Sequence, residues 1–419
     1  MIYKYQHIKA IPAALHNAAD TLGVYLPKLA ELDAFLTRLV EDDKHPFIGM
    51  RVLRRGQLIF NGAYGAQTPG GEPLFGDAIY PMQSVTKTFT ATCAAILQER
   101  GAFSYWDTVQ HWFPEFQGDG KDGVALWHCL CHTTGMSDGK IGEHSEAFWN
   151  GICGGYPWNI TDGEDKYRKI LDILAKARDA LGLPPPNDPD SVVDVNRALH
   201  MSAPLEFKPG STYNYVSFSY ELIRDLIELC SGQTLEQFAR ENIFEPLGMS
   251  DSHWYLPEEL RPRFVKRSPE DKGGQYLSSV HMMENTSPTG GLKSSLADLE
   301  RFAQMFLQGG TINGIRILSP ASVRLMTKDM NEKLPPSQWL GRELSSSWGL
   351  GWDVKNGKID DLGMLRSERS YNHCGFGGAR LLVDPDAELV VSMYMCEKRP
   401  ESYNDDMGNF TNILYSSLD

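Results

Sequence analysis

Strand-like sequence occurs near both ends of this chain, and the long stretch between the two regions is mainly helical. Near the N-terminus, two short apolar runs in FIGMRVLRRGQLIFNGAYG meet at Arg55-Gly56, which predicts a β-hairpin. Near the C-terminus, SSWGLGWDV and ARLLVDPDAELVVSMYM again have strand character, the second with an Asp-Pro-Asp turn in its middle. This order predicts an α+β protein whose two ends share one antiparallel sheet, flanked by helices, with a mainly helical region inserted between them.

The corresponding domain division puts residues 1–83 and 280–419 in an α/β sheet domain and residues 84–279 in a mainly helical domain. A helix is expected from Ser84 to Glu99, because its apolar side chains recur at steps of three and four and Gly101 follows. Elsewhere between about 137 and 210 the chain is polar and rich in Pro and Gly, which favours irregular structure around one helix. Further helices are expected over LPKLAELDAFLTRLVEDD, KYRKILDILAKARDALG, SYELIRDLIELCSG, LADLERFAQMFLQGG and near NFTNILYSSL.

Composition excludes several classes of partner. The chain carries 40 Lys and Arg against 54 Asp and Glu, a formal net charge of -14. Such a surface repels phosphate backbones and anionic lipid headgroups, so neither nucleic acid nor a membrane is expected as a partner. No stretch approaches the roughly 20 apolar residues that span a bilayer, and the N-terminus lacks a secretory signal pattern. Seven scattered cysteines do not suggest a disulfide framework, which favours a reduced, cytoplasmic protein.

The sharpest local feature is Ser84-Val85-Thr86-Lys87. On a helix, side chains three residues apart share a face, so the Ser84 hydroxyl and the Lys87 amine can meet. A serine hydroxyl needs an adjacent base to act as a nucleophile, and a desolvated lysine can lose its proton. On spacing alone, an N-cap serine with a solvated lysine remains an alternative. The same spacing recurs at Ser137 and Lys140, where the loop-like composition predicts no helix.

Two further motifs follow in order, Tyr215-Val216-Ser217 before an amphipathic helix and His373-Cys374-Gly375 before a strand. Together with Ser84-x-x-Lys87, they resemble the three signature elements of the serine β-lactamase and penicillin-binding-protein superfamily. The similarity is greatest to its class C-like branch of esterases, D-aminopeptidases and acyltransferases. It extends over about residues 45–396 through the segments LWHCLCHTTGM, IFEPLGMSDSHW, GGLKSSLADLERFAQMFLQGG and LLVDPDAELVV.

The resemblance implies a β-lactamase-like fold with the active site in the cleft between its two domains. It implies that Ser84 is the nucleophile, that Lys87 accepts its proton, and that Tyr215 shuttles the proton to the leaving group. The backbone N–H groups of Ser84 and Phe376 would form the oxyanion hole, which stabilises a tetrahedral intermediate. The substrate-binding residues would be Ser217, His373, Cys374 and Gly375.

Two departures from the family pattern bear on the substrate. Ser217 replaces the asparagine of many β-lactamases, and His373-Cys374-Gly375 replaces Lys-Thr-Gly, which weakens recognition of a carboxylate. A serine acyl hydrolase acting on a small ester or amide, without a cofactor, is therefore expected. β-Lactamase, D-aminopeptidase or DD-peptidase activity, acyl transfer and a non-catalytic penicillin-binding-like protein remain alternatives. The sequence gives no indication of oligomeric state.

Two rival assignments and one separate candidate site remain. Tyr276-Leu277-Ser278 repeats the tyrosine motif but lacks the preceding Pro-Gly turn and the following helix. A thiol nucleophile at Cys374 is disfavoured, because neighbouring strand residues point to opposite faces. His128 and His132 flank two cysteines in a way that suggests a metal site. The cysteines are only one residue apart, however, which zinc sites rarely use, and no metal is expected.

Overall fold

The computed structural model divides into two compact units, one formed by Met1–Ala102 with Ile223–Asp419 and the other by Phe103–Leu222. It describes residues 10–66, 77–157, 166–183, 193–339, 342–360, 362–398 and 403–419. The predicted domains, 1–83 with 280–419 and 84–279, follow the type of secondary structure, whereas the compact units follow packing. Residues 84–102 and 223–279, which the prediction placed with the helical region, fall in the first unit.

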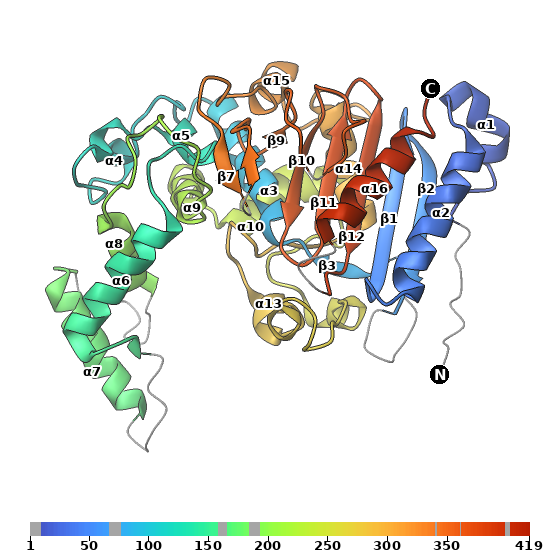
Figure 1. The fold of residues 1–419 in the computed structure, drawn as a ribbon. Helices are drawn as coiled ribbons and strands as arrows, with labels where there is room; N and C mark the ends of the chain where they lie inside the picture. The colour runs from blue at the N-terminus through green and yellow to red at the C-terminus, as the bar shows by residue number, and fades with distance from the viewer. Residues whose placement is uncertain are drawn as a thin grey trace. The chain divides into compact units, whose positions relative to one another are not determined.

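In the first unit, the described strands include a six-stranded antiparallel sheet of order β2-β1-β12-β11-β10-β9 (Figure 1). Its strands are β1 (Phe47–Arg54), β2 (Gln57–Gly65), β9 (Asp353–Val354), β10 (Tyr371–Gly375), β11 (Ala379–Asp384) and β12 (Leu389–Met395). Strand β1 pairs with β12 so that Ile48 lies opposite Met395. The two ends of the chain therefore share one antiparallel sheet, as the sequence predicts.

Both predicted turns of this sheet are confirmed. The β1–β2 hairpin reverses at Arg55 and Gly56, whose φ angles of 50° and 73° lie in the left-handed region. Turns with two such residues match the twist of the strands that they join. The Asp-Pro-Asp sequence ends β11 at Asp384, and β12 begins at Leu389.

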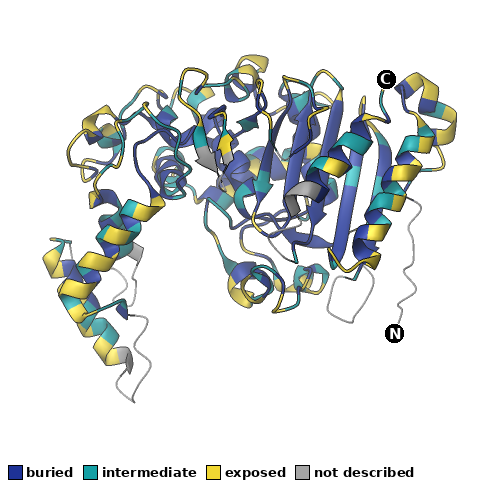
Figure 2. Ribbon diagram, viewed as in Figure 1, coloured by how far each residue is buried: buried dark blue, intermediate teal, exposed yellow. Residues whose placement is uncertain are grey.

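Helices cover both faces of the sheet. Helices α1 (Leu15–Leu22), α2 (Leu26–Glu41) and α16 (Tyr403–Tyr415) share an apolar core with one face, whereas α14 (Leu296–Leu307) packs against β1, β11 and β12. Figure 2 shows the strands as buried and α2 as exposed on its outer side. Leu29, Leu32 and Leu36 form the buried stripe of α2. This periodicity explains why the sequence alone identifies α2.

The remaining elements of the first unit connect these layers. They are β3 (Ile79–Pro81), η1 (Gln83–Val85), α3 (Thr86–Glu99), α10 (Leu235–Ala239), η4 (Arg240–Phe244), α11 (Glu245–Leu247), η5 (Glu258–Arg263), α12 (Gly274–Leu277), α13 (Val280–Glu284), β4 (Lys293–Ser295), β5 (Thr311–Ile312), β6 (Ile315–Arg316), α15 (Pro320–Met326), β7 (Ser337–Trp339) and β8 (Arg342–Leu344). Helix α9 (Phe218–Ser231) crosses the boundary between the units.

The strand predicted for SSWGLGWDV is largely wrong, because only its last two residues form β9. Gly349 explains the difference. A Cβ atom added at Gly349 would lie 2.1 Å from the carbonyl oxygen of Met326, so the backbone here packs against the end of α15 instead of extending the sheet. Such close approach requires glycine.

The second unit is helical, with α4 (Val109–Trp112), η2 (Lys121–Gly123), α5 (Leu126–Leu130), α6 (Asp138–Cys153), α7 (Lys166–Ala180) and α8 (Val193–Ser202). Trp149, Leu174, Ala177, Val195 and Leu199 form a buried cluster among α6, α7 and α8. The prediction of a single helix between 137 and 210 is therefore wrong. The apolar residues of α6 and α8 are sparse, and their burial depends on the neighbouring helices.

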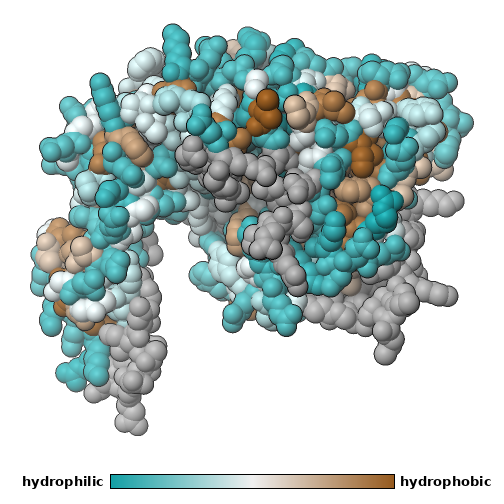
Figure 3. Space-filling model, in the orientation of Figure 1, coloured by the Kyte–Doolittle hydropathy of each residue, from teal (hydrophilic) through white to brown (hydrophobic). Residues whose placement is uncertain are grey.

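The face of the protein seen in Figure 3 is mainly hydrophilic, with separate apolar patches. In the part of the chain that the structure describes, no helix has both the length and the apolar character to cross a bilayer.

Candidate active site

Ser84 and Lys87 lie together in the first unit. The Lys87 Nζ atom is 3.2 Å from the Ser84 Oγ atom. The Lys87 side chain is 1% exposed, so the alternative of a solvated lysine is excluded. Ser84 belongs to the short helix η1, and α3 begins two residues later than predicted, with Val85 at its N-cap. Gln83, with a φ of 47°, makes a left-handed bend before this turn, which interrupts a regular helix start.

A loop following α13 holds the lysine amine from the other side. Lys87 Nζ also donates to the carbonyl oxygen of Thr289 at 3.1 Å. Thr90 Oγ1 donates to the Pro288 carbonyl at 2.8 Å, and Gln83 Nε2 donates to the Gly290 carbonyl at 3.3 Å. These contacts fix the loop against η1 and α3. Sequence reasoning missed Thr289, because its contribution is a backbone carbonyl that any residue could supply.

Strand β10 runs directly beside η1. A Cβ atom added at Gly375 would lie 2.2 Å from the carbonyl oxygen of Met82, so a glycine is required at this contact. Phe376 follows the end of the strand and is 45% exposed. Behind this turn, the buried guanidinium of Arg267 donates to the Gly377 carbonyl at 3.0 Å. The strand motif and the serine therefore lie on adjacent elements of one unit.

His373 is a neutral side chain in this structure. Its ring is 2% exposed, and Nδ1 donates to the carbonyl oxygen of Cys374 at 2.9 Å. Burial, the largest cause, lowers the pKa of His373 to about 3. His373 stands where many family members have the lysine of Lys-Thr-Gly, so at neutral pH this position carries no positive charge. A neutral imidazole binds a carboxylate more weakly than an ammonium group does.

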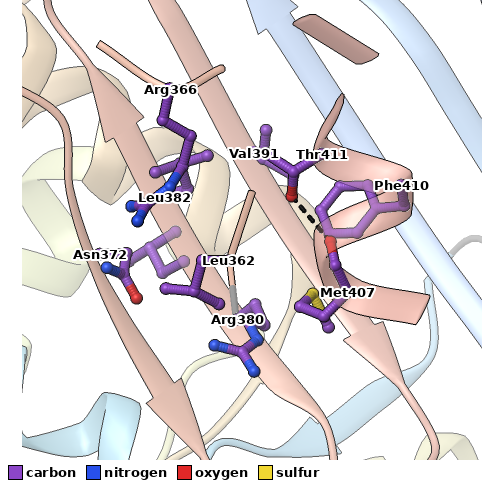
Figure 4. Close-up of a pocket in the computed structure, with 10 residues that line it drawn as sticks. Leu362, Arg366, Asn372, Arg380, Leu382, Val391, Met407, Phe410 and Thr411 are labelled. Carbon is purple, nitrogen blue, oxygen red and sulfur yellow. Dashed lines mark hydrogen bonds between the residues drawn. The ribbon is translucent and has the colours of Figure 1, made fainter. Parts of the chain in front are cut away.

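The Cys374 thiol points to the other face of the sheet from His373. Its Sγ atom contacts the guanidinium of Arg380 and lies 3.4 Å from Asn372 Oδ1. Figure 4 shows a cavity on that face, lined by residues of β10, β11, β12 and α16. The cavity leaves about 20 Å³ for the centre of a water-sized sphere, enough for one water molecule. It is too small for an ester substrate.

Tyr215 and Ser217 lie in the second unit, in a segment without helix or strand that precedes α9. Tyr215 is half-buried, and its ring packs against that of His132 with centroids 4.2 Å apart. The backbone N–H of Ser217 donates to Asp138 Oδ1 at 3.3 Å. An amphipathic helix, α9, follows this segment, as the sequence predicts.

The second Ser-x-x-Lys sequence has a structural role. Contrary to the prediction, a helix does begin there: Ser137 is the N-cap of α6, and its Oγ accepts from the Lys140 N–H at 3.0 Å. This cap stabilises the helix start despite the glycines that follow. Lys140 Nζ pairs with Glu143 at 2.7 Å on the surface. The rival Tyr276 lies on α12 in the first unit, where its hydroxyl accepts from Asn285 Nδ2 at 3.0 Å.

The two candidate metal-binding histidines use their Nδ1 atoms for backbone hydrogen bonds. His128 Nδ1 accepts from the Ala125 N–H at 3.0 Å, and His132 Nδ1 accepts from the Val216 N–H at 3.3 Å. Within the described ranges, no group of three His, Cys, Asp or Glu side chains is placed to hold a metal ion.

Replacing Gly375 with alanine is expected to lower the free energy of unfolding by about 1–3 kcal/mol, because the new methyl group overlaps the Met82 carbonyl. Urea unfolding followed by circular dichroism measures the change. Gly142→Ala is the matched control, since a Cβ atom there would meet no described atom within 4 Å. Equal effects of the two substitutions would contradict the close contact between β10 and η1.

Comparisons with known proteins show the family and the fold to which this chain is similar. The sequence model of the family described as Beta-lactamase matches residues 32–410. A putative D-alanyl-D-alanine carboxypeptidase of Escherichia coli (strain K12) is 21% identical, covering 91% of this chain and 85% of that protein. Esterase EstB of Burkholderia gladioli is 27% identical, covering 55% of this chain and 53% of that protein. A solved penicillin-binding protein homolog from Caulobacter crescentus matches with a TM-score of 0.69 at 18% identity, covering 99% of this chain and 100% of that one.

Proposed function

This chain belongs to the beta-lactamase family of serine hydrolases, and we propose that it cleaves neutral esters or amides through an acyl-enzyme on Ser84. One observation carries the proposal: the buried Lys87 places Nζ 3.2 Å from Ser84 Oγ. A nucleophile within hydrogen-bond distance of a desolvated base is the arrangement that acyl transfer requires.

In the proposed acylation step, Lys87 in its uncharged form takes the proton from Ser84 Oγ. The oxygen attacks the carbonyl carbon of the substrate, and the resulting oxyanion accepts hydrogen bonds from the N–H groups of Ser84 and Phe376. Each such donor typically contributes a few kcal/mol to the stability of the transition state. The contact of Gly375 with Met82 supports this pairing, because it brings the strand that precedes Phe376 against the turn that carries Ser84.

The sequence motif assigns the remaining proton transfer to Tyr215. In this proposal its phenol donates to the departing alcohol or amine, and collapse of the intermediate breaks the bond to that group. Water then attacks the acyl-enzyme, which releases the acid and restores Ser84. If another alcohol or amine reaches the intermediate first, the same site performs acyl transfer.

The neutral His373 supports the preference for uncharged substrates. β-Lactams and peptide C-termini carry a carboxylate, and the family's usual lysine at this position would bind it. Here the pKa of His373, lowered by burial to about 3, leaves no cation for that purpose at neutral pH. Ser217 also lacks the amide that many β-lactamases carry at this position. The similarity to an esterase is consistent with this substrate class.

We expect kcat/KM for p-nitrophenyl butyrate to exceed that for p-nitrophenyl hemisuccinate by at least about tenfold, because the hemisuccinate carboxylate would lose hydration without gaining a cation as its partner. The two substrates share a leaving group and differ mainly in the carboxylate. Release of p-nitrophenolate, followed by its absorbance, measures both rates under the same conditions.

A chromogenic cephalosporin is the second comparison, and its turnover is expected to be slow or absent. Ser84→Ala protein provides the background rate for all three compounds. Faster turnover of the cephalosporin or the hemisuccinate than of the butyrate would contradict the assignment of neutral substrates, while leaving Ser84 as the nucleophile.

A further inference from the structure

His132 is buried in the second unit in a backbone conformation that histidine seldom adopts. Its side chain is fully buried, and its φ of 60° lies in the left-handed region. A residue other than glycine stays in this region only when its surroundings hold it there. The contacts of His132 therefore show what this strained position maintains.

Two backbone hydrogen bonds connect His132 to the residues on either side of Tyr215. The carbonyl oxygen of His132 accepts from the Asn214 N–H at 2.9 Å. Its Nδ1 atom accepts from the Val216 N–H at 3.3 Å. Because Nδ1 accepts this hydrogen bond, that ring atom carries no proton. The main chain and the side chain of His132 thus fix the backbone on both sides of Tyr215.

The imidazole ring also packs against the tyrosine itself. The ring centroids of His132 and Tyr215 are 4.2 Å apart at an interplanar angle of 31°. The ring of His132 also lies near that of Tyr220, with the two ring centroids 5.4 Å apart. The Tyr220 hydroxyl donates to the Leu130 carbonyl at 2.9 Å, and its side chain is fully buried. The imidazole therefore connects Tyr215 to a fixed aromatic side chain.

We propose that His132 is a positioning residue that holds the Tyr215 phenol in the orientation for proton transfer to the leaving group. The inference rests on the proposed function, because it acts through Tyr215. Fixing a catalytic group before substrate binds removes the need to order it during the reaction. A residue that only stabilised the fold would affect all substrates alike, whereas His132 affects those whose leaving groups need a proton.

Leaving-group dependence tests this distinction. p-Nitrophenolate departs without a proton, but an alkoxide does not, so loss of Tyr215 function should lower kcat/KM more for an ethyl ester than for the matching p-nitrophenyl ester. For Tyr215→Phe we expect a loss of about 100-fold on the ethyl ester. For His132→Asn we expect a loss of about tenfold on the ethyl ester and under about twofold on the p-nitrophenyl ester. Asparagine tolerates positive φ and retains an acceptor near the position of Nδ1.

The double variant His132→Asn/Tyr215→Phe supplies the second readout. Because His132 acts through the phenol, adding His132→Asn to Tyr215→Phe should cause no further loss. His128→Asn is the matched control, since His128 also accepts from a backbone N–H and belongs to the same unit. It should leave the ratio of the two ester rates unchanged. Titration of Ser84 with a fluorophosphonate expresses each rate per folded site, which removes the effect of partial unfolding.

Equal losses on both esters, or losses that multiply in the double variant, would overturn the positioning role while leaving the acyl-enzyme intact. Full activity of Tyr215→Phe on the ethyl ester would instead refute the assignment of Tyr215, and this inference with it. Absence of fluorophosphonate labelling at Ser84 in the parent protein would refute the proposed function itself.

Discussion

The Ser84→Ala protein is expected to lose ester hydrolysis by at least about 10⁴-fold in kcat/KM and to show no covalent labelling by a fluorophosphonate. The reason is chemical: alanine has no oxygen to form the acyl-enzyme, and Lys87, 3.2 Å from the lost oxygen, has no proton to accept from it. Mass spectrometry of the labelled protein measures the adduct, and a spectrophotometric assay of p-nitrophenyl butyrate measures turnover.

Ser137→Ala is the matched control, because Ser137 occupies the second Ser-x-x-Lys sequence but caps α6. Its loss should lower the free energy of unfolding by about 1 kcal/mol, the usual contribution of an N-cap, without changing labelling. Labelling that survives Ser84→Ala would show that another residue is the nucleophile. If labelling disappears in Ser137→Ala while the protein remains folded, the nucleophile belongs to the Ser137 motif and not to the Ser84 motif.

The parts of the fold that could be predicted are those with a strong local pattern. The leucine stripe of α2 and the hairpin turn at Arg55-Gly56 depend on neighbouring residues, so periodicity and turn chemistry identify them. Helix α6 and the irregular course of SSWGLGWDV depend on tertiary contacts: the packing of Trp149 against neighbouring helices, and the approach of Gly349 to Met326. The residues that make these contacts are distant in the sequence, so a local pattern gives no sign of them.

The candidate site divides in the same way. The spacing of Ser84 and Lys87 predicts that the two side chains meet, and the structure confirms their contact. The Thr289 carbonyl that shares the amine comes from a loop about 200 residues away, so spacing gives no signal for it. His132 was visible only as a member of a histidine–cysteine cluster, which suggested a metal. Its contacts with Tyr215 are apparent only after the second unit has folded.

Replacing Lys87 is expected to slow acylation of Ser84 by at least about 10²-fold, the usual contribution of a general base. The Lys87 amine is the described basic group within hydrogen-bond distance of Ser84 Oγ. The rate constant for fluorophosphonate labelling measures acylation directly, separately from deacylation. Lys87→Ala also leaves the Thr289 carbonyl without this donor, which should lower the free energy of unfolding by about 1–3 kcal/mol.

Lys87→Gln separates the loss of the base from the loss of this structural contact. Its amide can still donate to the Thr289 carbonyl but cannot accept a proton from Ser84, so acylation should remain slow while stability recovers. A small alkylamine added to Lys87→Ala should restore part of the rate, because it can occupy the space of the missing amine and act as the base. Lys140→Ala, which removes a surface lysine paired with Glu143, should acylate like the parent protein. Acylation of Lys87→Gln at the parent rate would show that Ser84 is activated by a different group.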